Sequence, residues 1–218
     1  MRASKHTALS MVLAGVALSS LLVSYHHDSD AVVVAYEPIT QSSAAMTHAE
    51  RAERIRSAIL ALAEKHRTYG DRERLQQLAD TIYQESLAES LDPLLVAAII
   101  SMESSFRPAV VSEAGAVGLM QLRPFVAQDV AERHDLLWSG EITLVEPNQN
   151  VRLGVRYYRE LVDRFQGDER LALIAYNRGP TRLRLQMRDS GPEVASRYAE
   201  SVLRLYQQLC EDCGLLQA

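Results

Sequence analysis

The feature that most constrains the fold is an apolar run that ends at an ionisable residue. Residues 94–102 are apolar except for Ser101, and Glu103 follows them directly. A segment that is apolar on every side is typical of a buried helix rather than a surface helix. Asp92 and Pro93 precede the run, and these are a preferred N-cap and a preferred first helical residue. The sequence therefore predicts a helix inside the core whose last turn presents a carboxyl group at its end.

The position of Glu103 makes it a candidate general acid. Apolar surroundings disfavour a charged carboxylate, so they raise the pKa of a carboxyl group. A carboxyl with a raised pKa keeps its proton near neutral pH and can donate it to a leaving oxygen. The alternative is a glutamate at a helix end that simply points into water, and the choice depends on the rest of the chain.

Composition and pattern indicate a globular, mainly α protein. The 218 residues are 47% apolar and 23% charged, which suits one substantial core with room for an additional segment. The formal net charge of -5 is spread without a basic run. This argues against a nucleic-acid or acidic-membrane partner. Helical periodicity recurs along the chain, and strand alternation is not convincing in the body of the protein.

The N-terminus resembles an export signal. Arg2 and Lys5 precede an apolar run from Ala8 to Val23, and a positive flank before an apolar stretch is typical of such signals. The run is shorter than the roughly 20 residues that span a bilayer comfortably, so a cleaved signal and a retained inner-membrane anchor both stay open. A buried N-terminal helix is the alternative, and it would not need the charged flank. We expect a periplasmic or cell-envelope protein.

Helical segments follow on both sides of the central run. Two early helices are predicted, with Gly70 as a C-cap and Asp71 as an N-cap between them. Their apolar faces are formed by Ile55, Ile59 and Leu62 in the first helix, and by Leu75, Leu78, Ile82 and Tyr83 in the second. Later helices are predicted from about Leu119, interrupted by Pro124; from Pro147 to Gly167; from Asp168 to Asn177, before a break at Arg178–Pro180; and from near Pro192.

Two cysteines lie close together near the C-terminus. Cys210 and Cys213 could form a small disulfide in an exported protein. The same spacing occurs in redox and metal sites, but no second cysteine pair and no nearby histidine accompany it. A local disulfide or two free thiols is the interpretation that we carry forward.

Three segments place polar or glycine residues where helices start or stop. They are residues 103–106, residues 115–121 and residues 175–180. Glycines allow a backbone to approach a ligand closely, amide side chains recognise hydroxyl and amide groups, and tyrosines offer a flat face with a polar tip. Each segment alone has an ordinary explanation as a helix cap or core packing, but the three occur together.

In this order and spacing the segments resemble the catalytic domain of the soluble-lytic-transglycosylase family, a lysozyme-like α fold that cleaves peptidoglycan. The family's Glu-Ser pair matches Glu103 and Ser104, and its Gly-Leu-Met-Gln and Ala-Tyr-Asn runs match residues 118–121 and 175–177. The family's late tyrosine matches Tyr198.

The resemblance covers about residues 80 to 210. A Pro-x-x-Asn-x-x-x-Gly stretch of the family is also present, as Pro147, Asn150 and Gly154. One departure is Arg178, which stands where the family often has a small residue, so contacts at that rim of the site are in doubt. The resemblance does not explain the region before about residue 80. Together with the residue patterns, it leads us to expect three parts: a signal or anchor with linker at 1–35, a helical segment at 36–80, and the lytic transglycosylase domain at 81–218.

The implied reaction is non-hydrolytic cleavage of the β-1,4 bond between N-acetylmuramic acid and N-acetylglucosamine. Glu103 would act first as the acid and then as the base, giving a 1,6-anhydro end. Glycosidases ordinarily use two carboxylates, but Glu113, the nearest acid in sequence, is expected to be a solvated loop residue. By resemblance, Glu103 is catalytic, and the predicted substrate-binding residues are Ser104, Gly118, Met120, Gln121, Tyr176, Asn177 and Tyr198.

No metal or cofactor is implied, and the expected partner is the peptidoglycan glycan strand. Attachment to the inner membrane through residues 8–23 and contact with envelope machinery stay open. One alternative is a muramidase, which has the same fold but uses water as the nucleophile. Others are a non-catalytic peptidoglycan-binding envelope protein and a plain helical interaction module, and the latter would leave the glycine-rich loops unexplained.

Overall fold

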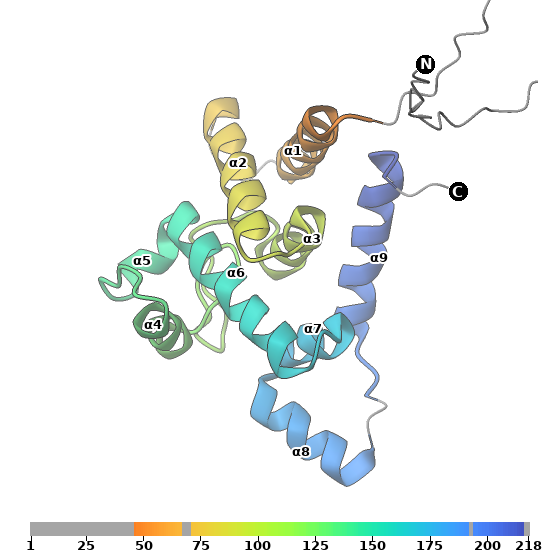
Figure 1. Cartoon of the computed structure of the whole chain (residues 1–218). Helices are drawn as coiled ribbons and strands as arrows, with labels where there is room; N and C mark the ends of the chain where they lie inside the picture. Colours follow the sequence, from red (N-terminus) through yellow and green to blue (C-terminus); the bar gives the residue numbers. More distant parts are fainter. Residues whose placement is uncertain (1–45, 67–70, 192–193, 216–218) are drawn as a thin grey trace, which may run out of the picture. The chain divides into compact units, whose positions relative to one another are not determined.

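The computed structural model describes residues 46–66, 71–191 and 194–215. The chain divides into two units, Met1–Ala44 and Ala45–Ala218, and the second contains every described residue. The described part is helical without named strands, so the prediction of a mainly α fold is confirmed (Figure 1). The helices are α1 (His48–Lys65), α2 (Arg72–Ala88), α3 (Pro93–Ser104), α4 (Pro124–Arg133), α5 (Ile142–Val145), α6 (Pro147–Arg164), α7 (Glu169–Arg178), α8 (Pro180–Ser190) and α9 (Arg197–Asp212).

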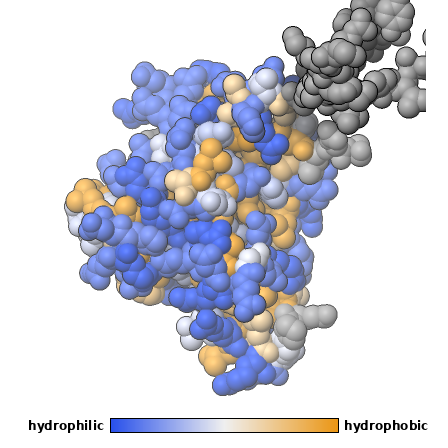
Figure 2. Space-filling model, in the orientation of Figure 1, coloured by the Kyte–Doolittle hydropathy of each residue, from blue (hydrophilic) through white to orange (hydrophobic). Residues whose placement is uncertain are grey.

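The helix α3 forms the centre of the core, as its apolar sequence predicts. Residues 94–100 are fully buried, and α3 packs against α1, α2 and α9. The predicted start is also confirmed, because the Asp92 carboxylate accepts a hydrogen bond of 2.8 Å from the Leu94 N–H and Pro93 is the first helical residue. The face of the molecule in Figure 2 is mostly hydrophilic, whereas the apolar residues of α3 are buried. This burial determines where the end of α3 can lie.

The helices α1 and α2 belong to the same core as the later helices. Their predicted apolar faces are confirmed: Tyr83 is half-buried, and Ile55, Ile59, Leu62, Leu75, Leu78 and Ile82 are buried in the cluster that contains α3. Asp71 caps α2 as expected, whereas Gly70 lies outside the described residues. The predicted boundary at residue 80 falls inside α2 and within one compact unit. The described residues before residue 80 therefore contribute to the same core.

The helix predicted from about Leu119 is wrong at its start. Residues 117–122 form a tight turn, in which the Val117 N–H donates to the Leu122 carbonyl (2.9 Å) and the Leu122 N–H donates back (3.2 Å). Gly118 and Gln121 have φ values of +85° and +49°, outside the helical region. The helix α4 begins only at Pro124, since a proline fits the first position of a helix better than its interior.

The end of the chain contains one helix more than predicted. Gly179, with φ of +89°, ends α7 as expected, but Pro180 then starts α8 at once. A proline after a glycine can mark the start of a helix as well as a break in one. Here Pro180 starts the helix α8. The final helix begins at Arg197 instead of near Pro192, with Ser196 as its N-cap. Pro192 itself lies outside the described residues.

Two further sequence predictions concern the ends of the chain. The apolar run Ala8–Val23 lies outside the described residues, so its role as signal or anchor stays a prediction. No helix in the described ranges has both the length and the apolar character needed to cross a membrane. Cys210 and Cys213 are buried free thiols, and burial raises the pKa of both. Of the two states predicted for the cysteines, the structure shows the free thiols.

Candidate active site

Glu103 lies in the last turn of α3, where the helix leaves the core. The two residues that end this helix, Ser105 and Phe106, adopt left-handed φ values of +51° and +57°. The Glu103 carboxylate accepts a hydrogen bond of 2.6 Å from the Tyr198 hydroxyl. Burial raises the pKa of Glu103 to about 7 and outweighs this hydrogen bond, which lowers it. Glu103 can therefore hold a proton at neutral pH, as its apolar surroundings predict.

Two tyrosines from distant parts of the chain surround this carboxyl. Tyr198 comes from the first turn of α9, and Tyr176 from the last turns of α7. Burial and the nearby Glu103 charge raise the pKa of both phenols well above the usual value, so both are neutral hydrogen-bond donors. The Tyr176 hydroxyl donates to the Met120 carbonyl at 2.6 Å. The structure thus brings the end of α3, the turn at 118–121, α7 and α9 together.

A buried asparagine holds the turn at residues 118–121. The Asn150 Oδ1 accepts from the Met120 N–H at 2.7 Å, and its Nδ2 donates to the Val117 carbonyl (3.0 Å) and the Leu144 carbonyl (2.9 Å). Asn150 is fully buried in α6. Because unsatisfied buried polar groups are costly, these three bonds make the turn conformation specific. This explains the asparagine of the Pro-x-x-Asn-x-x-x-Gly stretch.

Two glycines make room for this arrangement. A Cβ on Gly118 would lie 2.2 Å from both the Asn150 amide nitrogen and the Leu144 carbonyl oxygen. A Cβ on Gly154 would lie 2.4 Å from the Met120 sulfur. No side chain larger than hydrogen fits either position without movement of its neighbours. The glycines therefore allow close packing of the turn on α6.

Some predicted binding residues are accessible and others are not. Gln121 is half-buried, and its amide donates to the Val110 carbonyl (3.1 Å) and the Gly118 carbonyl (2.9 Å). Asn177 is exposed at the end of α7, and Tyr176 and Tyr198 are half-buried. These four side chains are at least partly accessible to solvent.

Ser104 and Met120 are placed differently from the sequence-based expectation. The Ser104 hydroxyl is buried and donates to the Ile100 carbonyl of its own helix at 3.2 Å. The Met120 side chain is fully buried against Gly154. Gly118 is also buried, in the turn. A sequence motif reveals neither a hydroxyl bond to the carbonyl four residues earlier nor the packing of a side chain in the core. The expected side-chain contacts of Ser104 and Met120 with substrate are not supported.

His66 is a supporting residue that the sequence did not suggest. Its Nε2 lies 2.9 Å from the Ser101 hydroxyl, and its ring stacks on Phe106 with centroids 5.8 Å apart. His66 is the C-cap of α1, and Phe106 is buried directly after the end of α3. A single histidine after a polar helix gives no local signal of such a contact. Glu113, by contrast, is exposed in its loop, as expected.

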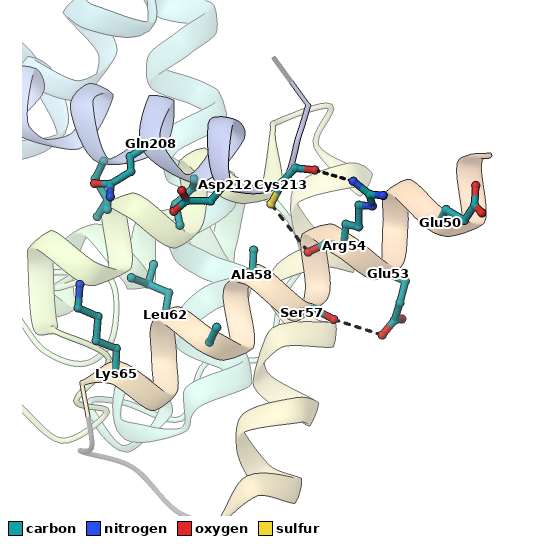
Figure 3. A pocket seen from close by; sticks show the side chains of 13 residues that line it. Glu50, Glu53, Arg54, Ser57, Ala58, Leu62, Lys65, Gln208, Asp212 and Cys213 are labelled. Carbon is teal, nitrogen blue, oxygen red and sulfur yellow. Dashed lines mark hydrogen bonds between the residues drawn. The ribbon is translucent and has the colours of Figure 1, made fainter. Parts of the chain in front are cut away.

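A separate cavity of about 750 Å³ lies between α1 and α9. Figure 3 shows that its walls combine apolar residues such as Leu62 with charged residues such as Glu53 and Asp212. Arg54 crosses one end, where its guanidinium donates to the Cys213 carbonyl at 3.3 Å. None of the predicted site residues lines this cavity. We therefore locate the candidate site by the Glu103 contacts.

The comparison with known families agrees with the geometry around Glu103. The sequence profile of the "Transglycosylase SLT domain" family matches residues 80–197, which is just over half of the chain. The chain belongs to this family. The SLT segment contains Glu103 and the runs at 118–121 and 175–177, while Tyr198 follows its last residue directly. The helix α1 and its His66 lie before it.

Named relatives and solved structures match this chain over only part of their own length. The chain is 39% identical over 100 residues to the "Transglycosylase" of Enterobacteria phage PRD1, covering 46% of this chain and 34% of that protein. It is 46% identical over 74 residues to "Endo-type membrane-bound lytic murein transglycosylase A" of Klebsiella pneumoniae, covering 32% of this chain and 36% of that protein. The chain thus spans about a third of the length of these two relatives.

Solved structures support the lysozyme-like SLT fold. An inactive glutamate-to-glutamine mutant of the lytic transglycosylase Slt from Pseudomonas aeruginosa superposes with a TM-score of 0.58 at 28% identity. That match covers 63% of this chain and 24% of the other. The 70 kDa soluble lytic transglycosylase of Escherichia coli gives a TM-score of 0.60 at 20% identity, over 75% of this chain and 30% of the other. The second likeness supports the fold alone.

Proposed function

We propose that the protein is a peptidoglycan lytic transglycosylase with a single catalytic carboxyl, Glu103. The observation that carries this proposal is the environment of that side chain. Burial raises its pKa to about 7, and the only other influence is the hydrogen bond from Tyr198. A second carboxylate close by would raise the pKa further by charge repulsion, but no acid of the described residues acts on Glu103 in this way. This supports the proposal of a site with one proton carrier.

The reaction that suits one proton carrier proceeds in two steps. Protonated Glu103 donates its proton to the oxygen between N-acetylmuramic acid and N-acetylglucosamine, and the bond from C1 to that oxygen breaks. The acetamido oxygen of the same N-acetylmuramic acid stabilises the positive charge at C1. The Glu103 carboxylate then takes the proton of the C6 hydroxyl, whose oxygen closes on C1. The products are a free N-acetylglucosamine hydroxyl, a 1,6-anhydro end and a reprotonated Glu103, without consumption of water.

Tyr198 has a defined part in this cycle. Between the two steps Glu103 is a half-buried carboxylate in apolar surroundings, and such a charge is costly without a hydrogen-bond donor. The neutral Tyr198 hydroxyl, 2.6 Å away, supplies that donor. We propose that Gln121, Tyr176 and Asn177 contact the sugars, since each is at least partly accessible to solvent. Ser104, Gly118 and Met120 support the site from inside.

The test is the product of a digest of purified sacculi. The wild-type protein should release fragments with 1,6-anhydro ends, and Glu103→Gln should keep the fold and lose several orders of magnitude in rate, because it removes the proton donor. Fragments with reducing ends would identify a muramidase. A wild-type protein that binds sacculi and never cleaves them would identify a non-catalytic binding protein.

The names of the relatives support a location in the cell envelope. Those proteins are described as membrane-bound or soluble murein transglycosylases, and murein lies in the envelope. We further propose that residues 8–23 direct export to the periplasm, as a cleaved signal or as an inner-membrane anchor. Fractionation of cells with and without these residues tests that proposal. Association with an envelope apparatus stays a prediction.

A further inference from the structure

Two hydrophobic clusters meet beside the candidate site. The larger cluster contains the apolar residues of α3, the helix whose last turn carries Glu103. The smaller cluster contains buried residues of α4 and the two ends of the tight turn, Val117 and Leu122. Among the residues that the structure describes, Tyr157 and Tyr176 are the two half-buried side chains that pack against both clusters. They therefore connect the cluster behind the acid with the cluster behind the turn.

Tyr157 lies on α6, and its ring contacts the ring of Tyr176 on α7. The two ring centroids are 5.5 Å apart and the ring planes are inclined by 45°. Tyr158, the next residue of α6, meets the same Tyr176 ring edge-on, with centroids 6.0 Å apart. Centroid separations in this range are typical of attractive aromatic pairs. Helices α6 and α7 also pack against each other (Figure 1), so the orientation of the Tyr176 ring depends on two consecutive side chains of α6.

The Tyr176 ring in turn fixes the backbone of the tight turn. Its hydroxyl donates to the Met120 carbonyl at 2.6 Å, while the Met120 N–H donates to the Asn150 Oδ1 of α6 at 2.7 Å. Both backbone groups of Met120 are therefore held from outside the turn, one by α6 directly and one by Tyr176. The next residue, Gln121, has a partly accessible side chain for which a sugar contact is proposed above. A displaced Tyr176 ring would release one of the two bonds that place this side chain.

The Tyr157 hydroxyl has no part in these contacts. Burial raises the pKa of this phenol, and the charges that affect it belong to Arg164, Glu160 and Arg133. The last two form an ion pair between α4 and α6. No hydrogen bond among the described residues contributes to the pKa of Tyr157. The Glu103 charge affects the pKa of Tyr176 but not that of Tyr157, so any influence of Tyr157 on the site comes from its ring.

We propose that Tyr157 is a positioning residue, whose ring orients Tyr176 and thereby fixes the turn at residues 118–121 relative to Glu103. The inference rests on the proposed function, because it adds to that reaction a residue that does not bond to the acid. The Tyr176 hydroxyl reaches the Met120 carbonyl only while its ring keeps this orientation. Without the Tyr157 ring, the turn keeps its bond to α6 but loses the support that comes through α7.

A double-mutant cycle on the clearance of purified sacculi tests the route through Tyr176. Tyr157→Leu should reduce kcat roughly three- to tenfold, the range that corresponds to the loss of one aromatic contact, with a smaller change in KM. Tyr157→Phe keeps the ring and should stay within roughly twofold of the wild type. Tyr176→Phe already lacks the hydroxyl that binds Met120, so adding Tyr157→Leu to it should reduce kcat further by less than roughly twofold.

The matched control is Tyr83→Leu. Tyr83 is half-buried on α2 and packs against the larger cluster, where the Arg56 guanidinium lies 4.1 Å from its ring centroid. This variant removes a comparable ring away from the site, so it should lower the unfolding free energy and leave kcat unchanged. A wild-type kcat in Tyr157→Leu would overturn the inference. Losses of kcat that add fully in the double variant would overturn it too, as would a Tyr157→Phe variant as slow as Tyr157→Leu.

Amide hydrogen exchange tests the inference without turnover. In Tyr157→Leu the Met120 N–H should exchange roughly three- to tenfold faster than in the wild type, relative to the amides of α2. Tyr157→Phe and Tyr83→Leu should keep the wild-type rate at this position. Tyr157→Met replaces Tyr157→Leu in both experiments if the latter does not fold. A wild-type protein that never clears sacculi would refute the proposed function alone, whereas unchanged exchange of Met120 in Tyr157→Leu would overturn the positioning role.

Discussion

The hydrogen bond from Tyr198 to Glu103 makes a quantitative prediction about the pH dependence of activity. Tyr198→Phe removes one hydroxyl, whose bond of 2.6 Å lowers the pKa of Glu103 against the larger effect of burial. A hydrogen bond to a charged group contributes about 1.5–3 kcal/mol. One pKa unit corresponds to about 1.36 kcal/mol. The pKa of Glu103 should therefore rise from about 7 by about one to two units.

The direction of the change in activity follows from the form that initiates the reaction. In the proposed mechanism protonated Glu103 begins catalysis, so the alkaline limit of activity should move upward by the same one to two units, roughly. The rate at the optimum should fall by roughly 10- to 100-fold, because the carboxylate formed in the first step loses its donor. Clearance of purified sacculi, followed by turbidity from mildly acid to alkaline pH, measures both quantities.

A matched control comes from the same helix. The Tyr206 hydroxyl also donates to a carboxylate, Asp92 Oδ2 at 2.9 Å, but away from Glu103. Tyr206→Phe should leave the alkaline limit of activity where it is in the wild type. If Tyr198→Phe left that limit unchanged, or moved it to lower pH, the assignment of Tyr198 as the partner of the Glu103 carboxylate would be wrong.

Three more predictions concern stability and support of the site. Because the pKa of Glu103 is about 7 in the folded protein and the ordinary pKa of a glutamate is 4.5, the wild type should lose up to about 3 kcal/mol of unfolding free energy as pH rises through this window. Glu103→Gln should not show this loss in urea titrations. An equal dependence of the unfolding free energy on pH in the two proteins would contradict this prediction. Asn150→Ala should destabilise the fold by roughly 3 kcal/mol or more, since it leaves three buried backbone groups without partners. A decrease in unfolding free energy below about 1 kcal/mol in urea titrations would refute the stabilising role of the Asn150 hydrogen bonds. His66→Ala should lower kcat at nearly unchanged KM and shift the alkaline limit of activity. His66→Gln can still form a hydrogen bond with Ser101, so it should restore part of kcat and part of the alkaline limit. Equal behaviour of the two variants would exclude a positioning role for His66.

Local sequence patterns determined the helices whose signals lie within a few residues. The apolar run at 94–102, with Asp92 and Pro93 before it, specifies a capped and buried α3 regardless of its partners. The same locality explains the errors. The turn at residues 117–122 depends on Asn150, which is thirty residues away from Met120 in the sequence. The sequence of the turn alone therefore resembles the start of a helix. Pro180 fits a helix start and a helix break equally well when only its neighbours are considered.

The sequence by itself determined the buried helix and the motifs around its end, and it predicted Glu103 as the acid. Only the tertiary structure decided which side chains meet that acid. Tyr198 bonds to Glu103 across 95 residues of chain, His66 reaches the end of α3 from α1, and Ser104 and Met120 turn into the core. The physical reason is that a capping residue or an apolar face acts within one or two turns. Contacts between helices depend on how their side chains pack together in space.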